Sequence, residues 1–584
     1  MERLKRFWFD YAHRYRWVYL AGVVCLVFTN VLTVAIPKLV QHAIDGLDPL
    51  DSGEARGWVS AIILAGVAIM LVRTLSRTLF FNPGRTVEFR LKNNLFQHLM
   101  ELPQGYYDRV RPGEIISRGT NDANSVRALI GFGSLQLFNV VFVLILTMIQ
   151  MLTTHWQLTL ICCIPLLFAA VILRYAIKGL FKLSKRAQAQ IAVLSDRILE
   201  FYNGVNVIRS YNAFEGARHR FDDANSELLE IGLGLVRITS WLLPVVFVVG
   251  NVCLVMLLFF GGPMVIEGDL TIGELAAFAV YINILVVALT SLGWLINSVQ
   301  RGWISLGRVS EVLEEPLERP VGGDSVPEAV DGGLSLKIDD LNFAYDSEAQ
   351  AVVEGVSVQA NPGQTVGVFG PTGSGKTTLL NLIARVYEPP DGTVRIGGVD
   401  VLSLDVKEYW NRVAIVSQEA FLFSTSISNN IALAEGANED NAERIRVAAE
   451  DAQLTEDLKA LPEGLDTRVG ERGITLSGGQ RQRTALARAF YRDFDLLLLD
   501  DVLSAVDHAT EEKLIRCIYQ RAKGATMVLV SHRTSVLQQA DMILVMEEGR
   551  VVARGTHAEL IEQEGVYRQA WRLQLDQEEE GAGD

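Results

Sequence analysis

The segment GPTGSGKT, residues 370–377, has the residue types of a loop that binds phosphate. It follows the apolar run TVGVF and precedes TLLNLIARV, which predict a strand and a helix on its two sides. The glycines let backbone N–H groups approach phosphate oxygens, and the helix directs its positive dipole end at them. Lys376 adds charge near the β- and γ-phosphates, and the Thr377 hydroxyl is placed to ligate Mg²⁺. The predicted phosphate-binding residues of this loop are Gly370, Thr372, Gly373, Ser374, Gly375, Lys376, Thr377 and Thr378.

Two adjacent carboxylates, Asp500 and Asp501, follow the apolar run LLLL. A hydrophobic strand that ends beside a phosphate-binding loop puts its terminal Asp500 in position to hold Mg²⁺ through the water shell of the ion. Thr377 and Asp500 therefore predict a nucleoside triphosphate site that uses Mg²⁺.

A second candidate anion site is LSGGQ, residues 476–480, at the start of a predicted helix. Its backbone N–H groups and serine hydroxyl suit phosphate, but it lies too far along the chain to extend the first loop. Together these motifs resemble the ATP-binding cassette family, whose signature is LSGGQ. The resemblance also rests on NFAYD, VSQEAFLF, VGERG, SAVD and SHR.

This resemblance implies roles for further residues. Tyr345 matches the aromatic residue that stacks on adenine, and Gln418 matches the Q-loop glutamine that serves the metal and the reaction. His532 matches the switch histidine, which contacts the γ-phosphate and joins Asp501 and Gln418 as a catalytic candidate. The signature residues that would bind ATP are Ser477, Gly478, Gly479 and Gln480, and the D-loop residues are Ser504, Ala505 and Asp507.

The first half of the chain holds apolar runs of about 20 residues, long enough to cross a bilayer. Lys and Arg cluster at the N-terminus and in the two long loops, which predicts that both termini and these loops are cytoplasmic. The loops contain apolar residues at helical spacing, so each is expected to be a helical hairpin with its turn in QGYYDRVRPGE or YNGVNVIRSYNA. The six predicted spans are 17–37, 58–79, 134–154, 156–175, 241–265 and 272–299.

The predicted fold class is an α-helical six-span transmembrane domain with long cytoplasmic extensions, followed by an α/β P-loop nucleotide-binding domain. A net charge of −15 at pH 7 argues against nucleic acid as a partner, and the five cysteines have no metal-ligand spacing. The predicted segments are a transmembrane domain at 1–313, a linker at 314–333, a cassette domain at 334–572 and an acidic disordered tail at 573–584.

The resemblance implies that two such half-transporters pair, with ATP held between the P-loop of one and the LSGGQ of the other. In the family a glutamate usually follows the Mg²⁺ aspartate, whereas this chain has Asp501. The missing methylene withdraws the carboxylate by about 1.5 Å, and a misplacement of ~1 Å can lower a rate about 10²-fold. We therefore expect a heterodimer in which this chain contributes a weakly hydrolytic site and an intact signature. The alternatives are a homodimer with Asp501 as the working base, or an ATP-gated regulatory or channel subunit.

Polar residues within the spans are candidates for the substrate cavity, because they are costly in lipid. Arg73 lies about one turn deeper than Arg77, for which snorkelling to the interface is the simpler interpretation. Asn30 and Gln300 are further polar residues of the spans. Drugs, lipids and peptides all stay open as substrates, and the resemblance favours export across a bacterial inner membrane. The predicted cavity residues are Arg73, Asn139, Asn251, Asn283 and Asn297.

Overall fold

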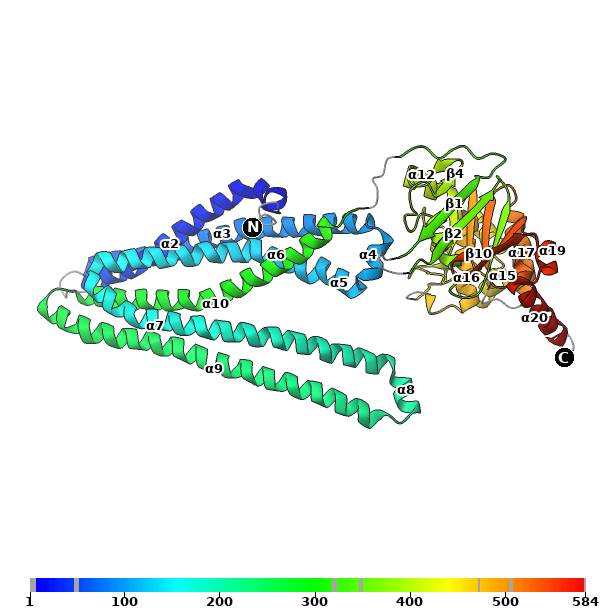
Figure 1. Ribbon diagram of the computed structural model, residues 1–584. Helices are drawn as coiled ribbons and strands as arrows, with labels where there is room; N and C mark the ends of the chain where they lie inside the picture. The colour runs from blue at the N-terminus through cyan, green and yellow to red at the C-terminus, as the bar shows by residue number, and fades with distance from the viewer. Residues whose placement is uncertain are drawn as a thin grey trace. The chain divides into compact units, whose positions relative to one another are not determined.

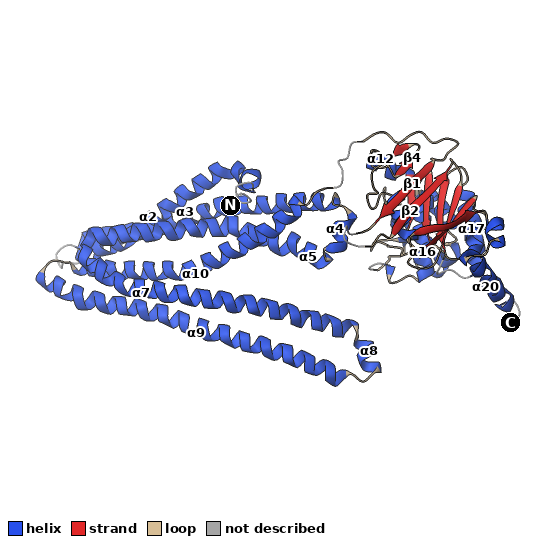
Figure 2. Ribbon diagram, viewed as in Figure 1, coloured by secondary structure: helices blue, strands red, loops and turns tan. Residues whose placement is uncertain are grey.

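The computed structural model describes residues 7–46, 52–317, 323–345, 350–470, 473–503 and 508–581. It divides into two compact units, one formed by Met1–Met100 with Pro112–Glu315 and the other by Glu101–Arg111 with Pro316–Asp584. Figure 1 follows the chain from its N-terminus to its C-terminus, and Figure 2 shows that the first unit is helical whereas the second contains the strands.

The helices of the first unit are long because apolar residues dominate their sequences. Five of the described helices are long and apolar enough to cross a membrane: Phe9–Asp45, Arg56–Met100, Pro112–Asn203, Phe214–Glu267 and Ile272–Glu314. The elements of this unit are η1 (Trp8–Ala12), η2 (His13–Tyr15), α2 (Arg16–Asp45), α3 (Ser52–Met100), α5 (Pro112–Ser117), η3 (Arg118–Asp122), α6 (Ala123–Ala128), η4 (Leu129–Gly133), α7 (Ser134–Asn203), α8 (Val205–Ser210), α9 (Phe214–Glu267) and α10 (Ile272–Glu314).

Helix α7 contains one break in its helical backbone, at His155, where φ is −156° and ψ is 102°. The predicted spans 134–154 and 156–175 lie on the two sides of this residue. After α7 the chain turns through α8 and returns as α9, which packs along α7 (Figure 1). The turn falls within YNGVNVIRSYNA, where Gly204 ends α7.

A polar contact fixes the start of α10 against the end of α2. Thr271 and Glu274 form a capping box, in which each side chain accepts a hydrogen bond from the other's backbone N–H. The Asp45 carboxylate accepts hydrogen bonds from the Thr271 hydroxyl at 2.8 Å and from the Gly273 N–H at 2.9 Å. These bonds satisfy N–H groups that a helix leaves unpaired at its first turn.

The second unit consists of two sheets and the helices packed against them. Its helices are α4 (Gln104–Arg109), α11 (Lys376–Ile383), α12 (Val406–Arg412), α13 (Ile427–Ile431), α14 (Ala442–Asp451), α15 (Thr455–Ala460), η5 (Gly464–Asp466), α16 (Gly478–Tyr491), α17 (His508–Arg521), α18 (Thr534–Leu537), α19 (His557–Glu562) and α20 (Val566–Gly581). Its strands are β1 (Leu336–Phe343), β2 (Val353–Ala360), β3 (Thr365–Phe369), β4 (Val394–Ile396), β5 (Val399–Asp400), β6 (Val413–Val416), β7 (Leu496–Asp500), β8 (Thr526–Ser531), β9 (Met542–Glu547) and β10 (Arg550–Gly555).

The larger sheet has the order β10-β9-β3-β8-β7-β6, and the smaller, antiparallel sheet has the order β2-β1-β4-β5. In the larger sheet the strands from β9 to β6 are parallel and only β10 is antiparallel. Strands β3, β7 and β8 are buried along their whole length, as their continuous apolar sequences require. Their carboxyl ends therefore meet at one edge of the sheet.

Two predicted boundaries differ from the structure. Residues 101–111, assigned by sequence to the transmembrane domain, group with the second unit, where Asp108 of α4 accepts a 2.7 Å hydrogen bond from Tyr387. The segment 573–584, predicted to be a disordered tail, is helical as far as Gly581 within α20. Helix α20 is anchored by Gln574, whose side chain bonds to the loop after β8. Residues 582–584 lie outside the described part of the chain.

Candidate functional site

The carboxyl ends of three adjacent strands surround a cavity of about 190 Å³. The P-loop follows β3, Asp500 ends β7 and His532 follows β8. The cavity is lined by residues 372–378 together with Gln418, Asp500, Asp501 and His532. The crevice at the carboxyl ends of parallel strands is where α/β folds bind ligands.

The P-loop adopts a conformation that its glycines make possible. Gly373 and Gly375 have φ values of +83° and +91°, in the left-handed region that other residues rarely adopt. A Cβ atom on Gly375 would also lie 2.6 Å from the carbonyl oxygen of Val352. Helix α11 begins at Lys376, so its unpaired N–H groups face the loop. The loop can thus present backbone N–H groups to phosphate oxygens.

The Lys376 ammonium group lies over the loop. Its Nζ donates hydrogen bonds to the carbonyl oxygens of Gly370 at 2.8 Å and Pro371 at 2.7 Å. Burial lowers the pKa of Lys376, while the charges of Asp501 and Asp500 oppose that shift. A phosphate would give the ammonium a charged partner in place of neutral carbonyls.

Asp500 is 4% exposed, and burial raises its pKa. The negative charge of Asp501 acts in the same direction, whereas a hydrogen bond from Thr377 and the charge of Lys376 oppose it. A buried carboxylate beside a hydroxyl is a suitable oxygen pair for Mg²⁺, which commonly takes one or two carboxylates and completes its octahedron with water and phosphate. The described residues contain no group of three His, Cys, Asp or Glu side chains that could hold a metal alone.

Asp501 and His532 form a polar pair at the same edge. Nδ1 of His532 lies 3.0 Å from Oδ1 and 3.1 Å from Oδ2 of Asp501. The Asp501 backbone has a φ of +48° and its N–H donates to the carbonyl oxygen of Val530. The sequence named both residues but gave no indication that they contact each other.

Tyr345 lies next to the P-loop helix. Its hydroxyl is 2.8 Å from Oγ1 of Thr378, and its ring meets that of Tyr387 edge to face at 5.0 Å between centroids. The side chain is 50% exposed, which leaves a ring surface available for stacking.

The LSGGQ segment lies apart from this cavity, because none of residues 476–480 lines it. Ser477 caps α16, and its Oγ accepts a 3.2 Å hydrogen bond from the Gln480 N–H. The Gln480 side chain returns a bond to the Ser477 N–H at 2.9 Å. Gly478 and Gly479 form the first turn of the helix. The predicted D-loop residues Ser504, Ala505 and Asp507 lie outside the described part of the chain.

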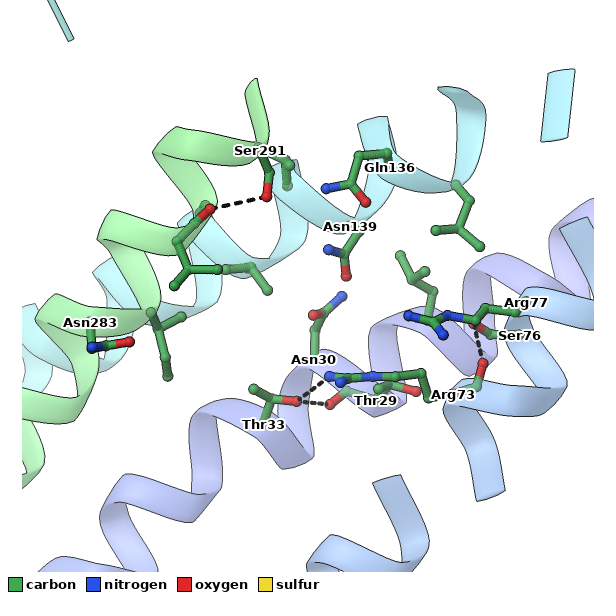
Figure 3. Close-up of a pocket in the computed structure, with 17 residues that line it drawn as sticks. Thr29, Asn30, Thr33, Arg73, Ser76, Arg77, Gln136, Asn139, Asn283 and Ser291 are labelled. Carbon is green, nitrogen blue, oxygen red and sulfur yellow. Dashed lines mark hydrogen bonds between the residues drawn. The ribbon is translucent and has the colours of Figure 1, made fainter. Parts of the chain in front are cut away.

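A second cavity, of about 310 Å³, lies in the helical unit between α2, α3, α7 and α10 (Figure 3). Three of the predicted cavity residues line it, namely Arg73, Asn139 and Asn283. Asn251 and Asn297 are not among its lining residues. Asn30 and Arg77, which the sequence also named as polar candidates of the spans, line it as well. The polar lining residues that the sequence analysis did not name are Thr29, Thr33, Ser76, Gln136 and Ser291.

The sequence did contain a signal for this lining. Thr29 and Thr33 are four residues apart, as are Arg73 and Arg77, and Gln136 is three residues before Asn139. Residues at these spacings share one face of a helix. These three pairs therefore mark the faces of α2, α3 and α7 that line the cavity.

Two family descriptions match the chain. Residues 19–289 match the family described as ABC transporter transmembrane region, and residues 353–504 match the family described as ABC transporter.

Sequence similarity to several bacterial proteins extends over almost the whole chain. The multidrug resistance-like ATP-binding protein MdlA of Escherichia coli is 32% identical and covers 95% of this chain and 94% of its own length. The probable multidrug resistance ABC transporter ATP-binding/permease protein YheI of Bacillus subtilis is 32% identical, and the similarity covers 99% of this chain and 98% of YheI. The ATP-dependent lipid A-core flippase of Vibrio vulnificus is 30% identical, with 98% and 97% covered. The solved structure of a bacterial Atm1-family ABC exporter with ATP bound has the same fold, with a TM-score of 0.78, 22% identity and 96% and 98% of the chains covered.

Proposed function

The chain belongs to the ABC transporter family as an exporter with a transmembrane and an ATP-binding domain, and we propose that it is one half of a two-chain pump for hydrophobic or amphipathic substrates. ATP hydrolysis coupled to transport is the activity of this class. The observation that carries the proposal is the convergence of the P-loop, Asp500 and His532 on one cavity.

The residues of this cavity have separable roles in the proposed cycle. The P-loop N–H groups and Lys376 hold the β- and γ-phosphates, and Tyr345 stacks on the base. Thr377 and Asp500 would hold Mg²⁺, which supplies charge neutralisation at the phosphates when it is bound, and Gln418 lines the same cavity. Residues 477–480 would complete the ATP site of a second half-transporter.

We further propose a heterodimer in which the site built on this P-loop hydrolyses ATP slowly. The support is the short carboxylate of Asp501, both oxygens of which lie at hydrogen-bonding distance from His532. A carboxylate occupied in this way, and about 1.5 Å shorter in reach than a glutamate, is poorly placed to polarise a water. The partner chain would carry the glutamate and would use the intact LSGGQ of this chain.

The membrane topology that we propose has six spans with both termini in the cytoplasm of a bacterium. The break at His155 supports this count, because it would divide α7 into two spans joined outside the cytoplasm. The bacterial relatives, which include a multidrug resistance-like protein and a lipid flippase, support an apolar or amphipathic substrate in the inner membrane.

The test is the ATPase turnover of the purified chain, alone and with the second half-transporter with which it co-purifies. Turnover that requires the pair and is insensitive to Asp501→Asn supports the heterodimer. A fully active homodimer that Asp501→Asn inactivates would instead establish Asp501 as a working base. Nucleotide binding without any turnover or transport in either preparation would favour the ATP-gated regulatory or channel subunit. Lys376→Ala serves as the control for ATP binding by this chain.

A further inference from the structure

Among the residues that the structure describes, two with positive charges, Arg73 and Arg77, and none with a carboxylate line the cavity in the helical unit. Arg73 and Arg77 come from the same face of α3, and arginine side chains stay protonated in proteins. Charged groups at membrane depth are costly and are kept where they serve function. The polar groups opposite them, from α2, α7 and α10, are neutral amides and hydroxyls.

The two guanidinium groups are poorly satisfied by the protein. Arg73 donates one long hydrogen bond, 3.5 Å from its Nη2 to Oγ1 of Thr33. Arg77 makes no hydrogen bond or ion pair with any residue in the part of the chain that the structure describes. Figure 3 shows the Arg77 side chain reaching into the cavity. Each guanidinium group carries five N–H donors, and almost all the donors of Arg73 and Arg77 lack an acceptor in the described part of the protein.

Asn30 adds an unused donor that is buried. Its side chain is 1% exposed, and its Nδ2 has no hydrogen-bond partner. In Figure 3 the amide of Asn30 points across the cavity toward that of Asn139. A buried N–H group without a partner is unfavourable, so an acceptor supplied by a bound molecule would stabilise this position.

We propose that this cavity binds the anionic headgroup of an amphipathic molecule, with Arg73, Arg77 and Asn30 as the donors. This inference rests on the proposed export function, and it names the substrate class. Guanidinium groups match the planar or tetrahedral oxygens of carboxylate, phosphate and sulfate, and Arg–anion hydrogen bonds are stronger than neutral ones. The matching donor from Asn30 would lie on the opposite wall.

The size and the apolar walls of the cavity favour a headgroup attached to an apolar chain. About 310 Å³ lies at the lower end of the volumes of small-molecule sites. Leu26, Val143 and Val287 contribute apolar surface beside the polar groups. An inorganic anion alone would leave that surface uncovered, whereas an amphiphile would cover it.

The test measures direct binding of radiolabelled dodecyl phosphate to the full transporter in phosphatidylcholine nanodiscs without ATP. Unlabelled dodecyltrimethylammonium and inorganic phosphate are the competitors. The variants are Arg73→Gln, Arg77→Gln and Arg77→Lys, and the matched control is Arg174→Gln, an exposed arginine of α7 that does not line the cavity. Elution volume checks the assembly of each variant.

We expect each glutamine variant to weaken dodecyl phosphate binding about tenfold, and Arg77→Lys to weaken it less because the charge remains. The cationic amphiphile should compete at least tenfold less well than unlabelled dodecyl phosphate. Equal competition by the two amphiphiles, or equal loss in Arg174→Gln, would overturn the proposal. Equal potency of inorganic phosphate would overturn the requirement for an apolar chain.

Nanodiscs that contain phosphatidylglycerol distinguish the two sources of the headgroup. If that lipid displaces dodecyl phosphate, the anion site is supported and a bilayer lipid is its occupant. If it does not, the anion site is supported with an added amphiphile as its ligand. Because binding is measured without ATP, an absence of ATP-driven transport would overturn the proposed function separately.

Discussion

The imidazole Nδ1 of His532 lies 3.0 Å and 3.1 Å from the two carboxylate oxygens of Asp501, across the ends of neighbouring strands β7 and β8. The Asp501 carboxylate is thus held by a side chain that the same edge would present to a γ-phosphate. A longer acid would have to occupy a different position relative to the imidazole. The length of this one side chain is therefore expected to control the chemistry of the site.

Lengthening that acid should activate the site. In a pair whose partner has its own catalytic glutamate changed to glutamine, Asp501→Glu should raise ATP turnover about 10- to 100-fold, because the carboxylate advances toward the water by about 1.5 Å. Steady-state phosphate release measures this turnover. The control, Asp501→Asn, should leave the turnover of the unmodified pair within about twofold. A loss of turnover in Asp501→Glu would contradict the proposed degenerate site.

Removing the buried charge of Asp500 should stabilise the protein without nucleotide. Burial raises the pKa of Asp500, so its contribution to stability is present in acid and is lost as the pH rises through that raised value. At neutral pH, Asp500→Asn should therefore raise the unfolding midpoint by about 2–4 °C. The gain should shrink on acidification and should be accompanied by loss of the stabilisation by MgATP.

Scanning fluorimetry in detergent, with and without MgATP, measures both effects. Asp440→Asn, a change at an exposed aspartate, is the matched control. It should change neither the unfolding midpoint without nucleotide nor the stabilisation by MgATP. An unchanged MgATP stabilisation in Asp500→Asn would exclude Asp500 from the Mg²⁺ site.

Most residues that line the cavity at the strand ends were predictable from sequence, because their motifs are local. The P-loop conformation depends on consecutive residues such as Gly373 and Gly375, and Asp500 ends an apolar strand that is recognisable by itself. The contact between Asp501 and His532 was not predictable, because it depends on the pairing of two strands distant in sequence. The role of Gln574 was not predictable either, because its hydrogen bonds also join residues distant in sequence. It was assigned to a disordered tail, although its side chain bonds to Thr534, 40 positions away.

The helical cavity shows a different limit. Hydropathy places a residue within a span but does not give the rotation of that helix about its axis. Asn139 and Asn251 are equally polar and equally within spans, yet only Asn139 lines the cavity. Rotation is determined by packing against neighbouring helices, as in the core that contains Cys253 and Phe278.

Gln574 is expected to position the loop that carries His532. Its Oε1 accepts hydrogen bonds from the N–H and the hydroxyl of Thr534, at 2.9 Å and 2.7 Å, and its Nε2 donates to the His532 carbonyl oxygen at 3.2 Å. Gln574→Ala removes three bonds that hold the loop. In the Asp501→Glu pair whose partner site is inactivated, it should lower the turnover of the site that contains His532 about three- to tenfold.

ATP affinity, measured by equilibrium binding, should stay within twofold in Gln574→Ala, because the hydrogen bonds of this side chain go to Thr534 and to the backbone of His532 rather than to the P-loop. Gln569→Ala, at an exposed glutamine of the same helix, is the matched control. Equal effects of the two substitutions on turnover would show that α20 acts only through its packing.

The hydrogen bond between Tyr387 and Asp108 is expected to link α4 to the nucleotide-binding core. The Tyr387 hydroxyl donates to Oδ2 of Asp108 at 2.7 Å, and burial together with this carboxylate raises the pKa of the tyrosine. Helix α4 follows α3 after three residues, so we expect this contact to transmit a movement of α3 to the core. Tyr387→Phe should leave basal ATPase within twofold but lower its stimulation by transported compounds about two- to fivefold.

A double-mutant cycle with Asp108→Asn separates this bond from other effects of the substitutions. If the bond carries the coupling, the double variant should be no worse than either single variant, and the coupling energy should be about 0.4–1 kcal/mol, which is the two- to fivefold loss expressed as a free energy. Additive losses would mean that the two side chains act independently. Stimulation equal to that of the wild type in Tyr387→Phe would remove this contact from the path between α3 and the ATP site.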